Sequence, residues 1–197
     1  LVQKVVPVPA LYIQLVDELE PCALLTRGLR IHGVIITSAE ARQHLSPIWG
    51  PDGRIYFNGD DRQWTGSAGR RGLWSVKPDS DEAERLWVTE PGALPTAADA
   101  RHVLYQSYTG GSWDVFALDL RSGASQNLTA EWSDDAFWGT LSPDGSAVAF
   151  VTRAGNLWAI WLAALDGSQA RPLLTIDPMW GRIAQVDMAE GRMSWSR

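Results

Sequence analysis

The chain has 197 residues, 45% of them hydrophobic, which is enough for one domain with a sizeable core. Its formal net charge of −6 disfavours a protein that follows the phosphates of nucleic acid, and no stretch of about 18 apolar residues is present that would span a membrane. The single Cys excludes an intrachain disulfide and fits either the cytoplasm or a bacterial periplasm.

The first predicted elements form only part of a repeating unit. Residues 11–26 open with the apolar pair Leu11-Tyr12, which is typical of a strand, and close with Leu25-Thr26. The next stretch, 29–44, does not fit the period of the rest of the chain. We therefore expect an insertion or a degenerate blade segment there, with an additional strand and a short helical turn capped by Ser38.

Three complete units follow, at about 45–90, 91–130 and 131–176, and a partial unit occupies 177–197. Their period of roughly 46 residues indicates supersecondary units that each need a neighbour to bury an apolar face. Three anchors keep one register: an acidic residue before a strand, an apolar or aromatic pair opening another strand, and a hydrophobic residue followed by Thr. They are, in that order, Asp52, Asp99, Asp144 and Glu190; Leu73-Trp74, Val115-Phe116 and Leu157-Trp158; and Val88-Thr89, Leu128-Thr129 and Leu174-Thr175.

The connections between the anchors indicate antiparallel strands, about four in each unit. ProAspGly at 51–53 and 143–145 predicts tight turns, because Pro presets φ, Asp caps the turn and Gly accepts a positive φ. Residues 119–123 and 165–168 predict further hairpin turns. A longer Gly-rich, basic loop at 62–72 is expected on one face of the domain, where binding residues accumulate.

The order of these motifs resembles the TolB-type, WD40-like (PD40) propeller repeat. Residues 47–57 match the opening of that pattern, and 114–119 and 127–129 match its second half. Residues 94–105 depart from it, because they keep only Asp99 of the ProAspGly turn. The resemblance implies an all-β fold, a β-propeller built from four-stranded antiparallel blades, and it says much less about function.

The two ends of the chain are expected to complement each other. A partial blade at 1–28 and another at 177–197 would together make one composite blade, which gives about four blades in this chain. The family it resembles usually has six blades, so the alternative is that the chain is part of a longer, six-bladed propeller. We favour this alternative because Leu1 is not an initiator Met, and an incomplete ring would be expected to self-associate.

The candidate binding residues are loop residues. Of the 11 Trp residues, Trp49, Trp74 and Trp158 fall on repeat anchors, which indicates packing between blades. Other Trp and Arg side chains lie in or beside loops, where they could meet a partner, although burial is the competing interpretation. These candidates are Trp64, Arg70, Arg71, Trp132 and Trp138.

Grouped oxygen ligands give the one cofactor hypothesis. Asn58, Asp60 and Asp61 follow a strand, and such carboxylate and amide oxygens are what Ca²⁺ requires. The competing interpretation is that Asp residues of this kind cap turns on an acidic surface. We expect no cofactor other than Ca²⁺, with these three residues as its candidate ligands.

No catalytic motif accompanies the repeats. The Gly-x-Ser-x-Gly string of a nucleophile elbow does not occur, nor does a phosphate-binding loop or a dinucleotide fingerprint. His32, His44 and His102 have no Cys or carboxylate at zinc-ligand spacing. The sequence therefore predicts a protein without catalytic residues of its own.

The resemblance implies a non-enzymatic protein-interaction scaffold or sensor module in the periplasm or another extracytoplasmic compartment of a bacterium; the cytoplasm is the alternative compartment. A protein partner is expected, and neither nucleic acid nor a membrane span. Two alternative functions stay open. One is the gating propeller that precedes the hydrolase domain of a prolyl-oligopeptidase-like serine peptidase, and the other is a carbohydrate-binding propeller, motivated by loop Trp residues beside Asp and Asn.

Overall fold

The structure, a computed structural model, describes residues 11–14, 46–60, 71–77, 83–85, 88, 90, 92–155, 157–176 and 192–195. Strands and short connections make up these residues, and no helix occurs among them. Nothing in the described segments could therefore cross a membrane as a long apolar helix. The insertion predicted at 29–44, with its cap at Ser38, lies outside the described residues.

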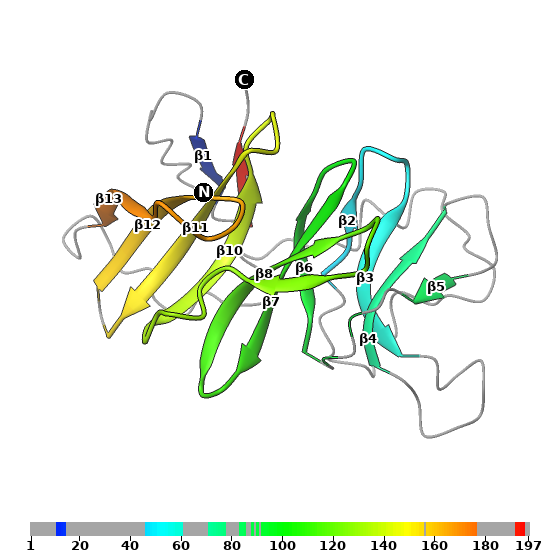
Figure 1. The fold of residues 1–197 in the computed structure, drawn as a ribbon, viewed down its shortest axis with the longest axis horizontal. Coiled ribbons are helices and arrows are strands. Elements are labelled where there is room, and N and C mark those ends of the chain that lie inside the picture. The colour runs from blue at the N-terminus through cyan, green and yellow to red at the C-terminus, as the bar shows by residue number, and fades with distance from the viewer. Residues whose placement is uncertain are drawn as a thin grey trace.

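Three four-stranded antiparallel sheets follow one another along the chain, and each joins its strands in sequence order (Figure 1). The first contains β2 (Ile48–Trp49), β3 (Ile55–Asp60), β4 (Arg71–Val76) and β5 (Ala83–Arg85). The second contains β6 (Leu94–Ala98), β7 (His102–Thr109), β8 (Ser112–Asp119) and β9 (Ser125–Asn127). The third contains β10 (Asp135–Leu141), β11 (Ala147–Ala154), β12 (Leu157–Ala164) and β13 (Arg171–Ile176). The predicted all-β fold of four-stranded antiparallel blades is confirmed.

The two remaining strands come from opposite ends of the chain and pair with each other (Figure 1). β1 (Leu11–Gln14) runs antiparallel to β14 (Arg192–Trp195), with Leu11 opposite Trp195. Met193 of β14 is buried against the third sheet, beside Phe137 and Trp138. How many blades the protein has, and where each predicted unit begins and ends, stay predictions.

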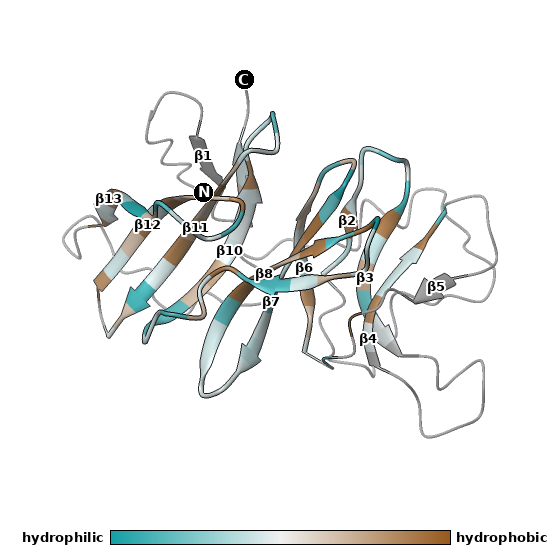
Figure 2. Cartoon of the chain, viewed as in Figure 1, coloured by the Kyte–Doolittle hydropathy of each residue, from teal (hydrophilic) through white to brown (hydrophobic). Residues whose placement is uncertain are grey.

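Hydrophobic residues recur along the strands of the second sheet (Figure 2), and both faces of this sheet are covered by its neighbours. Successive side chains of a strand point to opposite faces, so a strand covered on both sides is apolar throughout. Val103 and Tyr105 of β7 pack with Tyr56 and Leu73 of the first sheet. Leu104, between them, packs on the other side with residues of the third sheet. The core therefore lies between the sheets.

The turns joining β2 to β3 and β10 to β11 have the geometry that ProAspGly predicts. Gly53 and Gly145 have φ values of 76° and 70°, and each donates its N–H to the carbonyl three residues earlier. Gly145 also faces the preceding sheet, where a Cβ would come within 2.8 Å of a carboxylate oxygen of Asp99. This turn therefore needs Gly both for its φ and for the close approach of its neighbour.

The hydrophobic-Thr anchor has a specific role in the second sheet. The Thr129 hydroxyl donates to the buried Asp114 carboxylate at 3.1 Å and accepts the N–H of Val115 at 3.1 Å. Thr109 donates to the other carboxylate oxygen of Asp114 at 3.0 Å. This network fixes the segment after β9 to the start of β8, and it satisfies a carboxylate that would be expensive to bury alone.

A bulge in β10 turns one aromatic side chain into the core. The strand register shifts between Phe137 and Thr140, and Trp138 takes a φ of 56°. Its backbone N–H donates to the side-chain carbonyl of Gln106 in β7 at 2.8 Å. Gln106 is fully buried, so this bond links the second and third sheets through a polar group inside the core.

Candidate functional site

The connections of the second and third sheets alternate between two ends of the strands. We call the end with the β6–β7, β8–β9, β10–β11 and β12–β13 connections the turn end. The opposite end carries the β7–β8 and β11–β12 hairpins, and we call it the tip end. The neighbouring sheets cover both faces of the second sheet, so its two ends are its exposed surfaces. The chemistry of these two ends differs.

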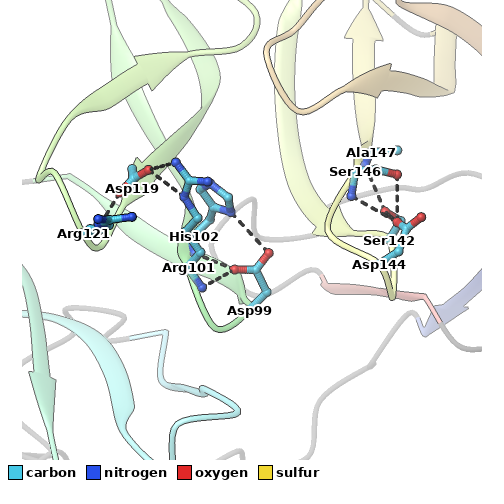
Figure 3. Close-up of polar contacts among 9 residues, drawn as sticks. All are labelled: Asp99, Arg101, His102, Asp119, Arg121, Ser142, Asp144, Ser146 and Ala147. Carbon is cyan, nitrogen blue, oxygen red and sulfur yellow. Dashed lines mark hydrogen bonds and ion pairs between the residues drawn. The ribbon is translucent and has the colours of Figure 1, made fainter.

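At the turn end, carboxylates cap their own turns (Figure 3). Asp119 accepts the N–H groups of Arg121 and Ser122, and Arg101 donates to it twice, at 2.9 and 2.8 Å. The bond from the Ser122 backbone, followed by that from Arg101, holds the pKa of this carboxyl well below its usual range. A carboxylate held in this way is a structural acceptor.

Asp144 has the same role in the β10–β11 turn (Figure 3). The hydroxyl groups of Ser142 and Ser146 donate to one of its oxygens at 2.6 and 2.8 Å, and the Ser146 N–H does so at 3.1 Å. The Ser142 bond is the largest cause that lowers the pKa of Asp144 to about 2. Its carboxylate is therefore ionised near neutral pH, with one oxygen held by the turn.

Asp99 and His102 form a further polar pair at this end (Figure 3). Asp99 accepts the backbone N–H of Arg101 and of His102, and its second oxygen lies 3.3 Å from Nδ1 of His102. The imidazole thus adds a third contact to a carboxylate that already caps its turn. Like its neighbours, this group serves the local fold.

Two large hydrophobic side chains, Tyr108 and Leu157, are exposed at the tip end. Tyr108, at the end of β7, is 59% exposed, and its ring meets Trp113 of β8 edge to face with 5.8 Å between the centroids. The Tyr108 hydroxyl donates to the carbonyl of Gly111 at 3.1 Å, which holds the ring over the hairpin. Leu157, at the start of β12, is 57% exposed. Exposed aromatic groups of this kind are common in protein interfaces.

A single carboxylate joins the two hairpin tips. One oxygen of Asp135 accepts the Trp113 backbone N–H at 3.1 Å, and the other lies 3.4 Å from the Arg153 guanidinium. Arg153 in turn lies over the ring of Trp158, with its Cζ 5.9 Å from the ring centroid. The contacts run from β8 through β10 to β11 and β12, so the two tips form one continuous surface.

The sequence-predicted binding residues do not come together at one place in the described part of the chain. Trp132 is half-buried, with its ring 4.5 Å from that of Trp161 and 5.2 Å from that of Phe150. Trp138 is 1% exposed, so its indole belongs to the core. Trp64 and Arg70 lie outside the described residues, as does the side chain of Arg71, whose backbone begins β4 opposite Asp60.

The predicted calcium ligands are described only in part. Asn58 is 7% exposed, and its side-chain amide donates to the carbonyl of Ala93 at 2.8 Å. Asp60 ends β3, and its side chain and the whole of Asp61 lie outside the described residues. In the part of the chain that is described, no three His, Cys, Asp or Glu side chains form a group that could hold a metal ion.

Sequence reasoning did not select Tyr108, Trp113 or Arg153 of the tip end as binding residues. Trp158 was assigned to packing as a repeat anchor, and it does stack on Trp138 with 6.1 Å between the ring centroids. Its contact with Arg153 could not be read from spacing. The run TyrThrGlyGlySerTrp at 108–113 carried a usable signal, since a Gly-Gly turn between two aromatic residues predicts a hairpin with both rings at its tip.

No family model matches the chain. The Tol-Pal system protein TolB of Anaeromyxobacter dehalogenans (strain 2CP-C) is 33% identical over 120 residues, which is 56% of this chain and 27% of that protein. The crystal structure of TolB from Acinetobacter baumannii superposes with a TM-score of 0.52 over 65% of this chain and 31% of that one, at 22% identity. The chain has a β-propeller fold, and its sequence is similar to TolB over the matched segment. The matched segment spans about a quarter of the TolB relative's length.

A shorter match is to an enzyme. The oligogalacturonate lyase of Dickeya dadantii (strain 3937) is 32% identical over 68 residues, which is 34% of this chain and 18% of the enzyme. The β-propeller fold accounts for the repeated four-stranded sheets described above. It leaves open which surface of this chain meets a ligand or a partner.

Proposed function

We propose that this chain is a protein-interaction propeller of the TolB type that acts in an extracytoplasmic compartment of a bacterium, without catalysis of its own. The observation that carries the proposal is the 33% identity with a Tol-Pal system protein TolB over 120 residues. The two hairpin tips support it, because they expose Tyr108 and Leu157 and are held together through Asp135. Components of a Tol-Pal system are the first partners to test.

The direct test is to tag the chain in its native bacterium, fractionate the cells and cross-link the intact envelope. We expect the tagged protein in an extracytoplasmic fraction, cross-linked to a defined protein that is identified by mass spectrometry. Binding between the two purified proteins, measured by calorimetry, must then reproduce the cross-link. A tagged protein confined to the cytoplasm, or purified proteins that do not bind, would contradict the proposal.

Carbohydrate binding is the second candidate, because of the 32% identity with an oligogalacturonate lyase over 68 residues. Calorimetric titration with galacturonate oligomers tests it, and the same mixtures assayed for cleavage products test for lyase activity. Binding of the oligomers without cleavage would favour a carbohydrate-binding propeller, and cleavage would favour an enzyme. The peptidase-gating role stays a prediction.

A further inference from the structure

The tip end holds one cationic side chain of the protein itself, that of Arg153. The Arg153 guanidinium lies over the Trp158 ring at 5.9 Å and 3.4 Å from the carboxylate of Asp135. An aromatic ring attracts a cation through its negative face, and a carboxylate beside it adds a charge-assisted contact. This surface therefore shows, at one tip, the two groups that hold a guanidinium.

The neighbouring tip carries an aromatic pair and has no guanidinium among its described residues. Tyr108 and Trp113 form the aromatic pair, and the Trp113 backbone is fixed to Asp135 at 3.1 Å. Asp134 precedes Asp135, and the exposed Glu131 lies in the same link between β9 and β10. The aromatic pair at this tip is thus bordered by the carboxylate-bearing link.

Charge differs between the two ends of the sheets. In the two tips and the β9–β10 link, the charged side chains are Glu131, Asp134, Asp135 and Arg153, so carboxylates are in excess. At the turn end, by contrast, the carboxylates Asp99, Asp119, Asp144 and Asp166 are accompanied by Arg101, Arg121 and Arg171, so the two signs are nearly balanced. A cationic partner is therefore attracted to the tip end, whereas an acidic one is repelled there.

We propose that the tip end docks a partner segment rich in Arg and Lys, whose cations lie on the Tyr108–Trp113 pair and contact the carboxylates of the β9–β10 link. This assignment rests on the proposed interaction function and adds the chemistry of the partner. The cation at Tyr108 would occupy the place that Arg153 occupies at Trp158. A flexible basic segment could reach both groups, since each contact needs only one long side chain.

The test uses three immobilised probes: a synthetic peptide that alternates Arg with Ser, its counterpart with Glu in place of Arg, and a galacturonate oligomer. Binding of the whole chain is measured by biolayer interferometry at several salt concentrations. We expect the Arg peptide to bind, with affinity that falls as salt rises. Tighter binding to the Glu peptide or to the galacturonate oligomer, or no binding to the Arg peptide, overturns the assignment.

Variants localise the contact. Tyr108→Ala and Asp134→Asn are each expected to raise the Kd for the Arg peptide by about two- to fivefold. Asp166→Asn removes one negative charge at the turn end, where Asp166 caps its turn by accepting the Ser168 N–H at 2.9 Å, and should leave the Kd unchanged. Thermal unfolding of each variant confirms that it is folded. Equal weakening by Asp134→Asn and Asp166→Asn would mean diffuse attraction to an acidic protein and would overturn the assignment.

Failure of the tip-end assignment can be distinguished from failure of the proposed interaction function. If the envelope partner binds the wild-type chain and Tyr108→Ala equally, the interaction role stands and the tip assignment fails. If the Arg peptide binds at Tyr108 and no envelope partner is recovered, the tip assignment stands and the proposed role fails.

Discussion

Thr129 shows how one hydroxyl group can account for a repeat anchor. It is fully buried, donates to Asp114 and accepts from the Val115 backbone. The anchor of the third sheet ends in Thr175, which is exposed on the outer strand β13. The Thr of this anchor therefore contributes differently to stability in two neighbouring repeats, because only the Thr129 hydroxyl has to satisfy buried partners.

Thr129→Val keeps the shape of the side chain and removes its hydroxyl. We expect the free energy of unfolding to fall by about 1–3 kcal/mol, since a buried carboxylate and a buried N–H each lose a partner. Thr175→Val is the matched control and should change it by less than about 0.5 kcal/mol. Urea denaturation measures both, and equal losses in the two variants would contradict the proposed role of the Thr129 network.

Calcium binding by Asn58, Asp60 and Asp61 stays a prediction at the same scale. If the three side chains bind Ca²⁺, the ion should raise the melting temperature of the wild-type chain, because a ligand that binds only the folded state stabilises it. The variant that combines Asp60→Ala with Asp61→Ala should lose this increase. No change in the wild type at about millimolar Ca²⁺, an affinity range seen in extracellular modules, would exclude the site.

At the scale of the element, the turns owe their order to carboxylates that accept backbone N–H groups. Asp119, Asp144 and Asp166 each have a pKa below the usual value, and hydrogen bonds are the leading cause in all three. A carboxyl whose pKa is lowered by folding stabilises the folded state above its unfolded pKa. That contribution disappears as pH falls through the folded-state pKa.

Acid denaturation of Asp144→Asn tests this argument. The pKa of Asp144 is lowered from 3.8 to about 2, so the wild type should lose stability as pH falls between these values. The variant, which has no carboxylate to protonate there, should show a shallower loss over the same range. Ser142→Ala should raise the pKa of Asp144 in a nuclear magnetic resonance titration, because it removes the largest cause of the shift. Superimposable stability curves for wild type and Asp144→Asn would contradict the assignment.

At the scale of the whole molecule, the sheets approach each other closely at glycines. Gly167, in the β12–β13 turn, has a φ of 81°, and a Cβ there would lie 2.6 Å from the carbonyl oxygen of Leu128 in the segment after β9. Gln126 reaches across the same seam and donates to the Asp166 carbonyl at 2.9 Å. A clash between this Cβ and the backbone of Leu128 could not be relieved by a change of side-chain rotamer.

Gly167→Ala is therefore expected to destabilise the protein more than Gly53→Ala. Gly53 has a similar φ of 76° but nothing within 4 Å of an added Cβ, so its substitution reports only the backbone conformation. We expect a loss of about 1–2 kcal/mol at Gly53 and a further loss of about 1–3 kcal/mol at Gly167. Chemical denaturation of both variants measures the difference in the free energy of unfolding. Equal losses would mean that the contact between the second and third sheets adjusts to the added methyl group without loss of stability.

The sequence could predict what depends on neighbours along the chain. Gly53 and Gly145 take the positive φ that ProAspGly requires, and the antiparallel order of strands follows from the short turns between them. The burial of Trp138 could not be predicted, because it depends on a bulge and on Gln106 in another sheet. The contacts of Asp135 with Trp113 and Arg153 could not be predicted either, since Trp113 and Asp135 come together only when two sheets pack.

The covering of the second sheet on both faces has a consequence for how the molecule opens. Its strands share one apolar interface with the first sheet and another with the third, so it cannot separate without disrupting both. Stability in such a row of units behaves as a sum of nearest-neighbour couplings, and local opening is cheapest where a unit has one coupling to lose. Amide protons in the middle of β7 and β8 should therefore be among the slowest to exchange with solvent.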